Sequence, residues 1–200
     1  MGVGGWGATV SEMSVQVPAP LRLVESFLNS VDVSTARDEL GSTGRFAAWL
    51  VVHQRAAQPV TVSEEELALA RDLRDALRAE LRSHATRDST DPARRNALVR
   101  LDALAFRVPL RARVAEDGAW LAPAADGVLG VLGELLAAVV LADHDGSLRR
   151  LKICRSERCQ QAYYDWSKNA SRCWCSMQTC GNRSKTRAYR GRRREAARAG

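Results

Sequence analysis

Lysine and cysteine are nearly missing from this 200-residue chain, and both are confined to its last quarter. Aromatic residues make up only 6% of the chain, and the longest apolar stretch, from Val128 to Ala142, is interrupted by Glu134. That stretch is too short to span a bilayer, so it predicts a buried helix rather than a membrane segment. The N-terminus has no basic segment followed by an apolar run, which argues against a secretory signal. We therefore expect a cytoplasmic protein.

Charge divides the chain at about residue 148. Residues 1–147 contain 15 arginines and 20 acidic residues, a net charge of −5, whereas residues 148–200 contain 15 basic and 3 acidic residues, a net charge of +12. Such a change of composition indicates two regions with different chemistry. The first residues are rich in Gly, Ser and Pro and lack periodicity. We expect a disordered arm over 1–18, a mostly helical domain over 19–147 and a basic domain over 148–200.

Hydrophobic periodicity predicts a helical first region. Ser63 and Glu66 have the spacing of a capping box, and Asp126 is a candidate N-cap. A helix from Leu21 buries one apolar face, although a short strand that enters a turn at Asn29-Ser30 fits as well. Further helices are expected at Arg45–Gln54, from Ser63 to about His84, from Pro92 to about Phe106, and from Gly127 to about Asp143.

A β-hairpin is expected over Val108–Pro123. Apolar residues alternate there on both sides of a turn at Glu116-Asp-Gly118, and this period of two is typical of paired strands. Trp49 and Trp120 could line a pocket, but large aromatic side chains are more often core residues, which is what we expect for both. The predicted fold class is therefore α+β, with a mostly helical domain that contains a hairpin.

The first region contains no convincing active site. His53, His84 and His144 are far apart in the sequence, and none is accompanied by a Ser or Cys partner in a catalytic motif. The sequence also lacks a Gly-rich phosphate loop. We therefore expect that the protein is not an enzyme.

The cysteines have the spacing of a zinc site. Four residues separate Cys154 from Cys159, four separate Cys175 from Cys180, and fifteen lie between the pairs. Two pairs of ligands around an intervening loop suit a tetrahedral site, and thiolates are preferred zinc ligands. Because four thiolates leave no open position, one zinc ion would be structural rather than catalytic. Disulfides are the weaker alternative in a reducing compartment.

The residues between the pairs predict a second hairpin. Ala162–Trp166 favours a strand, 167–171 favours a turn, and Arg172–Trp174 can return as the partner strand, which zinc would close. In such a strand Cys173 and Cys175 point to opposite faces, so only one can reach the metal. We assign Cys175, because its spacing to the last cysteine repeats that of the first pair. Cys173 is then a free thiol.

A basic helix is expected after the last cysteine. Gly181 and Asn182 would form a turn and N-cap, and the helix would extend from Arg183 toward Ala199. Arginine binds phosphates with two hydrogen bonds, which favours nucleic acid as the partner. Asn182 and Arg183 could read base edges, or they could serve only as a cap and a phosphate clamp. The candidate nucleic-acid contacts are Asn182, Arg183, Lys185, Arg187, Arg190, Arg192, Arg193 and Arg194.

The same residues carry a resemblance to known domains. Trp174-Cys-Ser-Met, followed by Cys180-Gly-Asn-Arg183, resembles the CGNR zinc finger, although Cys173 stands where that finger usually has arginine. Upstream, Phe27-Leu-Asn-Ser30 is similar to the FxNT-like motif of the ABATE domain, with Ser in place of the commoner Thr. Together the resemblances cover about residues 20–195. They imply a bacterial stress-induced transcription regulator whose zinc ligands are Cys154, Cys159, Cys175 and Cys180.

These features predict a zinc-dependent regulator that binds double-stranded DNA in the cytoplasm, at the nucleoid. Its first domain would sense an unknown small-molecule effector or form a homodimer. One alternative is RNA binding, in which aromatic residues of the finger stack on unpaired bases. Another is a protein-interaction module whose basic tail adds only nonspecific affinity. The candidate stacking residues are Tyr163, Tyr164, Trp166 and Trp174.

Overall fold

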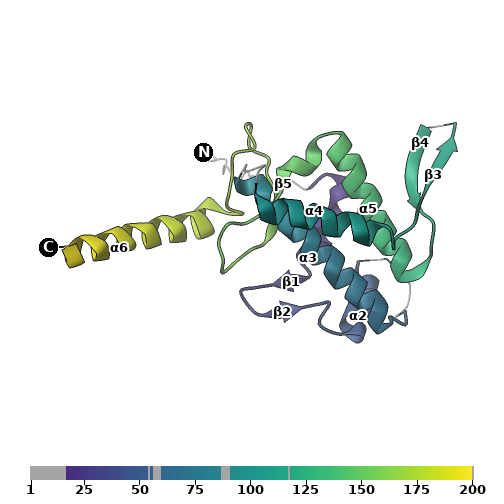
Figure 1. Cartoon of the computed structure of the whole chain (residues 1–200), viewed down its shortest axis with the longest axis horizontal. Helices are drawn as coiled ribbons and strands as arrows, with labels where there is room; N and C mark the ends of the chain where they lie inside the picture. Colours follow the sequence, from purple (N-terminus) through teal and green to yellow (C-terminus); the bar gives the residue numbers. More distant parts are fainter. Residues whose placement is uncertain (1–16, 54, 56–59, 87–90, 117, 200) are drawn as a thin grey trace, which may run out of the picture.

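The structure is a computed structural model that describes residues 17–53, 55, 60–86, 91–116 and 118–199. It combines helices with three small two-stranded antiparallel sheets, which confirms the predicted α+β class. Figure 1 shows a helical body with two projections. One is the hairpin of β3 (Leu110–Ala115) and β4 (Gly118–Pro123), and the other is helix α6 (Asn182–Ala199). Residues 1–16 of the expected arm lie outside the described residues.

Helix α3 (Glu64–Thr86) is the centre of the body. The predicted capping box is confirmed, since Ser63 Oγ accepts the Glu66 N–H at 3.1 Å and the Glu66 carboxylate accepts the Ser63 N–H at 2.9 Å. Leucines spaced four residues apart bury one face of the helix. The helices that pack against α3 are α1 (Ala19–Leu28), α2 (Thr43–Val52), α4 (Pro92–Ala105) and α5 (Gly127–His144).

Several helix ends follow local sequence rules. The segment from Leu21 is helical, so the alternative strand is excluded, and Pro20 lies in the first turn of α1, where proline is tolerated. Helix α2 begins slightly before the predicted start, because Ser42 Oγ accepts the Arg45 N–H at 3.3 Å. Asp126 is the N-cap residue of α5, as predicted, but its side chain makes no capping hydrogen bond. The first residue of α5, Gly127, has a φ of +63°, in the left-handed region that favours glycine.

Helix α5 is long and apolar enough to cross a membrane by length and composition alone, but half of it is buried inside the fold. Its apolar face packs against α1, α3 and β4, as the sequence predicted for a core helix. Trp49 is buried, as expected. Trp120 is not, with 40% of its surface exposed. It lies on the projecting β3–β4 hairpin, where it contacts the Arg113 guanidinium at 6.0 Å rather than the core.

Two short strand pairs were not predicted. Strand β1 (Val31–Asp32) pairs with β2 (Arg37–Asp38), and β5 (Leu151–Ile153) pairs with β6 (Ala162–Tyr164). Strand β6 matches part of a predicted strand, but its expected partner, Arg172–Trp174, is not a strand. All three residues of β5 are buried, and β5 packs against α3. Pairing with β5 therefore removes apolar surface from water, which the predicted partner could not do.

Candidate metal centre and basic groove

The four predicted cysteines lie together. The sulfur atoms of Cys154, Cys159, Cys175 and Cys180 all lie within 4.8 Å of one another. The Cys159 and Cys175 sulfurs are 3.6 Å apart, and those of Cys175 and Cys180 are 3.8 Å apart. Tetrahedral zinc with Zn–S bonds of about 2.3 Å requires sulfur separations of about 3.8 Å. The four thiols therefore fit one zinc ion, while Cys173 lies outside the cluster.

The first two cysteines lie on a tight loop after β5. The Cys154 N–H donates to the Gln161 carbonyl at 2.9 Å, which closes the base of the loop. Within it, the N–H groups of Cys159 and Gln160 donate to the Ser156 carbonyl at 2.8 and 2.9 Å. Gln160 has a φ of +50°, so the chain turns sharply directly after the second cysteine. We call residues 154–160 the first knuckle.

Of the second pair, Cys175 lies two residues before a π-helical turn, η2 (Met177–Gly181), and Cys180 lies within it; the turn runs directly into α6. Ser176 starts this turn, because its hydroxyl accepts the Thr179 N–H and its carbonyl accepts two later amides at 3.0 Å. A π turn changes the direction of side chains within a helix and is frequent at functional sites. Here it is followed by Asn182, whose side-chain amide donates to the Gln178 carbonyl at 3.3 Å. The predicted N-cap role of Asn182 is therefore wrong, since the helical chain has already started.

A buried ion pair holds the loop between the two pairs of cysteines. Lys152 Nζ donates to Asp165 Oδ2 at 2.8 Å, and also to the carbonyls of Ala170 and Arg172. Burial opposes ionisation of Asp165, but hydrogen bonds from Lys152 and Ser167 outweigh it and lower the pKa of Asp165 to about 2. The sequence interpretation missed this pair. The signal in the sequence was a lysine between two aliphatic residues, because a lysine in such an apolar segment is rarely buried unless it is paired.

The aromatic residues of the finger are largely structural. Tyr163 and Tyr164 are 7% and 8% exposed, and the Tyr163 hydroxyl donates to the Arg172 carbonyl at 2.8 Å. Trp174 packs partly buried against the cysteine cluster. Trp166 is 45% exposed, with its ring 4.6 Å from that of Tyr164. Stacking on bases, as the RNA alternative requires, is thus open mainly to Trp166.

The thiols of the cysteine cluster do not lose their protons independently of one another. A hydrogen bond from the Cys175 thiol lowers the pKa of Cys154 to about 5. The hydrogen bond with Cys154, together with burial, raises the pKa of Cys175, and burial raises that of Cys180 to about 11. Four adjacent thiolates repel one another unless a cation lies between them. A divalent ion removes this repulsion and lets every ligand lose its proton.

A basic groove of about 820 Å³ lies between the first knuckle and α6. Four arginines at i, i+4, i+7 and i+11 of α6 line one wall, because that spacing places them on one helix face. Two arginines of the first knuckle line the other wall, and Glu157 is the one acidic residue among the described lining residues. We call this set the groove arginines: Arg155, Arg158, Arg183, Arg187, Arg190 and Arg194.

The groove divides the predicted nucleic-acid contacts into two sets. Asn182 and four of the predicted arginines line it, whereas Lys185, Arg192 and Arg193 lie on other faces of α6. Arg155 and Arg158 were missed by the sequence interpretation. Their signal was their position directly inside the first pair of cysteines, which the zinc ion would fix in space.

Fold and site together define a helical body that carries a four-thiolate zinc finger. Residues 150–193 match the CGNR zinc finger model. Residues 21–144 match ABATE, the family described as "Putative stress-induced transcription regulator". Because this match spans more than half of the chain, the protein belongs to the ABATE family, which confirms the resemblance seen in the sequence. No curated protein sequence matches the chain.

Proposed function

We propose that this protein is a transcription regulator that binds double-stranded DNA through the groove arginines and depends on zinc to do so. The observation that carries the proposal is the convergence of six arginines from two separate segments on one groove. Each guanidinium can donate two hydrogen bonds to a phosphate. Arg183 and Arg194 are about 16 Å apart along the helix, a length that covers several phosphates of one strand.

The metal gives the groove its shape in this proposal. One wall lies between Cys154 and Cys159, and the other, α6, begins two residues after Cys180. Zinc supplies a cross-link among the four thiolates that holds the two walls at a fixed separation. The chain's own contribution is the short connection of each cysteine to its wall, since Arg155 and Arg158 lie next to ligands. Without the cross-link, the two sets of arginines would move independently.

Duplex DNA is favoured over RNA by what the structure buries. Tyr163 and Tyr164 are core residues and cannot stack on bases. A single projecting helix such as α6 fits the major groove of B-form DNA, whereas the major groove of A-form RNA is too narrow. Because Asn182 is hydrogen-bonded to Gln178, we assign base reading to Arg183 and a positioning role to Asn182.

The remaining features of the proposal rest on family membership. A transcription regulator acts by binding, so we propose no enzymatic activity and a cytoplasmic location at the nucleoid. A cavity of about 430 Å³ beside Trp49 and His53 is the place we propose for a small-molecule effector. The homodimer stays a prediction, which the mass of the particle in solution would test.

The first test compares the two faces of α6 at equal charge. One variant carries Arg187→Gln and Arg190→Gln on the groove face, and its matched control carries Lys185→Gln and Arg192→Gln on the other faces. Binding to labelled genomic duplex fragments is measured at several salt concentrations, with a structured RNA as competitor. We expect the groove variant to lose about tenfold or more in DNA affinity and about two counterions in salt dependence. The control should lose much less.

Two results would contradict the proposal. Equal losses in the two variants would reduce the tail to a nonspecific electrostatic anchor, because only total charge would then matter. Displacement of the duplex by RNA at equal concentration would favour the RNA alternative. Zinc-dependent retention of particular duplex fragments would support a sequence-reading regulator.

A further inference from the structure

The ABATE-like motif Phe27-Leu-Asn-Ser30 touches the metal-bearing segment directly. The Asn29 side-chain amide donates to the Ala162 carbonyl at 3.1 Å, and the Ala162 N–H donates to Asn29 Oδ1 at 2.8 Å. This two-point contact matches the way a neighbouring strand would pair with β6. Ala162 follows the first knuckle by only two residues. The end of α1 is thus fastened to the chain directly after the knuckle.

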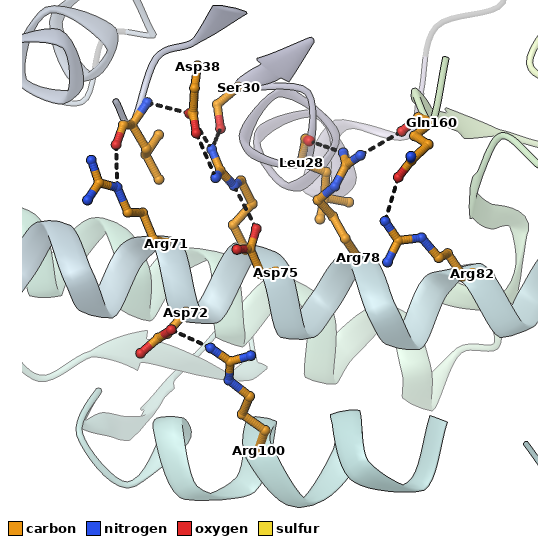
Figure 2. Close-up of polar contacts among 12 residues, drawn as sticks. Leu28, Ser30, Asp38, Arg71, Asp72, Asp75, Arg78, Arg82, Arg100 and Gln160 are labelled. Atoms are coloured by element: carbon orange, nitrogen blue, oxygen red, sulfur yellow. Dashed lines mark hydrogen bonds and ion pairs between the residues drawn. The ribbon is translucent and has the colours of Figure 1, made fainter. Parts of the chain in front are cut away.

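A buried arginine makes a second link between the same two segments. Arg78 on α3 donates to the Leu28 carbonyl at 2.6 Å and to the Gln160 carbonyl at 2.8 Å. Arg82, one turn later, donates to the Gln160 side-chain oxygen at 2.6 Å. Figure 2 shows both arginines reaching from α3 toward Gln160, on the same side of the helix as Arg71. Gln160 is the residue whose φ of +50° turns the chain after Cys159.

Arg78 is held at an energetic cost that packing alone does not explain. It is only 4% exposed, and its hydrogen-bond partners among the described residues are two uncharged carbonyls. Burial, with repulsion from Arg82 and Arg74, lowers the pKa of Arg78 to about 10. Arg74 is equally buried, but it pairs with the carboxylate of Asp38. A charge without a carboxylate partner costs free energy to bury. The contacts that accompany this cost are those that join Leu28 to Gln160.

We infer that Arg78 and Asn29 are positioning residues of the metal centre, which hold the first knuckle in its metal-binding shape on the helical body. Arg78 fixes the carbonyl of the turn after Cys159, and Asn29 fixes the strand that follows. Partners outside the ligand shell orient the ligands, and their removal weakens metal binding. The inference concerns retention of the metal and does not depend on what the groove binds.

The test measures how fast the full-length, zinc-loaded chain releases its metal to a chromogenic chelator. Arg78→Met removes the link, and Arg74→Met is the matched control, one turn earlier on α3 and equally buried. We expect Arg78→Met to release zinc roughly 10–100-fold faster than the wild type. Arg74→Met should lower thermal stability but leave the release rate close to that of the wild type. Circular dichroism establishes that each variant is folded at the assay temperature.

Two milder variants decide the matter if Arg78→Met does not fold. Asn29→Ala removes the other link and should also speed release. Arg78→Lys keeps a cation that reaches only one of the two carbonyls, so it should also release zinc faster than the wild type. Equal release rates for Arg78→Met and Arg74→Met, or wild-type rates for both milder variants, would overturn the inference. Because DNA is absent from the assay, these outcomes are independent of the proposed function.

Discussion

Asp165 is the residue on which the loop between the two pairs of cysteines depends. One of its carboxylate oxygens accepts the Ser167 N–H and hydroxyl, and the other accepts Lys152 Nζ and the Arg172 N–H. It therefore joins strand β5, through Lys152, to the segment that leads into Cys175. Removing one partner of a buried pair leaves the other charge without compensation, which is more costly than losing a surface contact.

We expect Asp165→Ala to lower the free energy of unfolding by about 3–5 kcal/mol, because it leaves the Lys152 ammonium buried and unpaired. Urea unfolding at saturating zinc measures the change. Asp145→Ala is the matched control, since Asp145 also accepts the N–H of a serine two residues later but is exposed and contacts no lysine. A loss no larger than that of the control would contradict the assigned role.

Asp165 should also make the stability of the folded chain depend on pH. The pKa of Asp165 is about 2 in the folded chain, below its value of about 3.9 in an unfolded chain. The unfolded state therefore binds more protons between these values, so stability rises with pH there and falls as the pH drops from about 5 toward 2. The free energy of unfolding of Asp165→Asn, measured by urea unfolding, should therefore change less with pH over this range than that of the wild type. The same pH dependence of the free energy of unfolding in the variant and the wild type would show that Asp165 is not the responsible group.

At the scale of elements, local signals predicted some parts of the fold and failed for others. Helix α3 was predictable because its capping box and leucine spacing act within the helix itself. The partner of β6 was not, because the sequence allows Arg172–Trp174 as well as β5. Packing of β5 against α3 decides between them. The cysteine set was predictable from spacing, whereas the groove depends on how the knuckle and α6 meet in space.

Helix α6 has little support from the helical body. It projects from the body and packs mainly on η2 (Figure 1). Pairs such as Arg183 and Arg187, or Arg190 and Arg194, lie four residues apart, and each like-charge pair costs about 0.2–0.5 kcal/mol. Phosphates along the groove would relieve this repulsion. Binding of DNA should therefore stabilise α6 more than any other helix.

We expect backbone amides of α6 to exchange hydrogen much faster than those of α3 when DNA is absent, because exchange reports local opening. Adding duplex DNA at low salt should slow exchange in α6 and leave α3 nearly unchanged. Hydrogen exchange read by mass spectrometry of peptides measures both helices in one sample. Exchange in α6 that is slow without DNA, or that DNA does not change, would contradict this account.

At the scale of the whole molecule, the metal-bearing segment and the helical body share one apolar core. Leu151, Ile153, Ala162 and Tyr164 belong to the same buried cluster as the leucines of α3. The four thiols adjoin this core through a smaller cluster around Tyr163. Under the proposed function, loss of the metal would therefore disturb the groove without separating the finger from the body. Zinc would add the fixed relation between the first knuckle and α6.

The most direct measurement of the central claim is the affinity of one protein preparation for a duplex DNA fragment with zinc, after chelation and after zinc is returned. Cys175→Ser and Cys173→Ser, which differ only in whether the lost thiol belongs to the cluster, are measured beside it. We predict that chelation and Cys175→Ser each lower affinity about tenfold or more, a loss of about 1.4 kcal/mol. Returned zinc should restore the wild type, and Cys173→Ser should bind normally. Undiminished binding by the chelated protein and by Cys175→Ser would contradict the account.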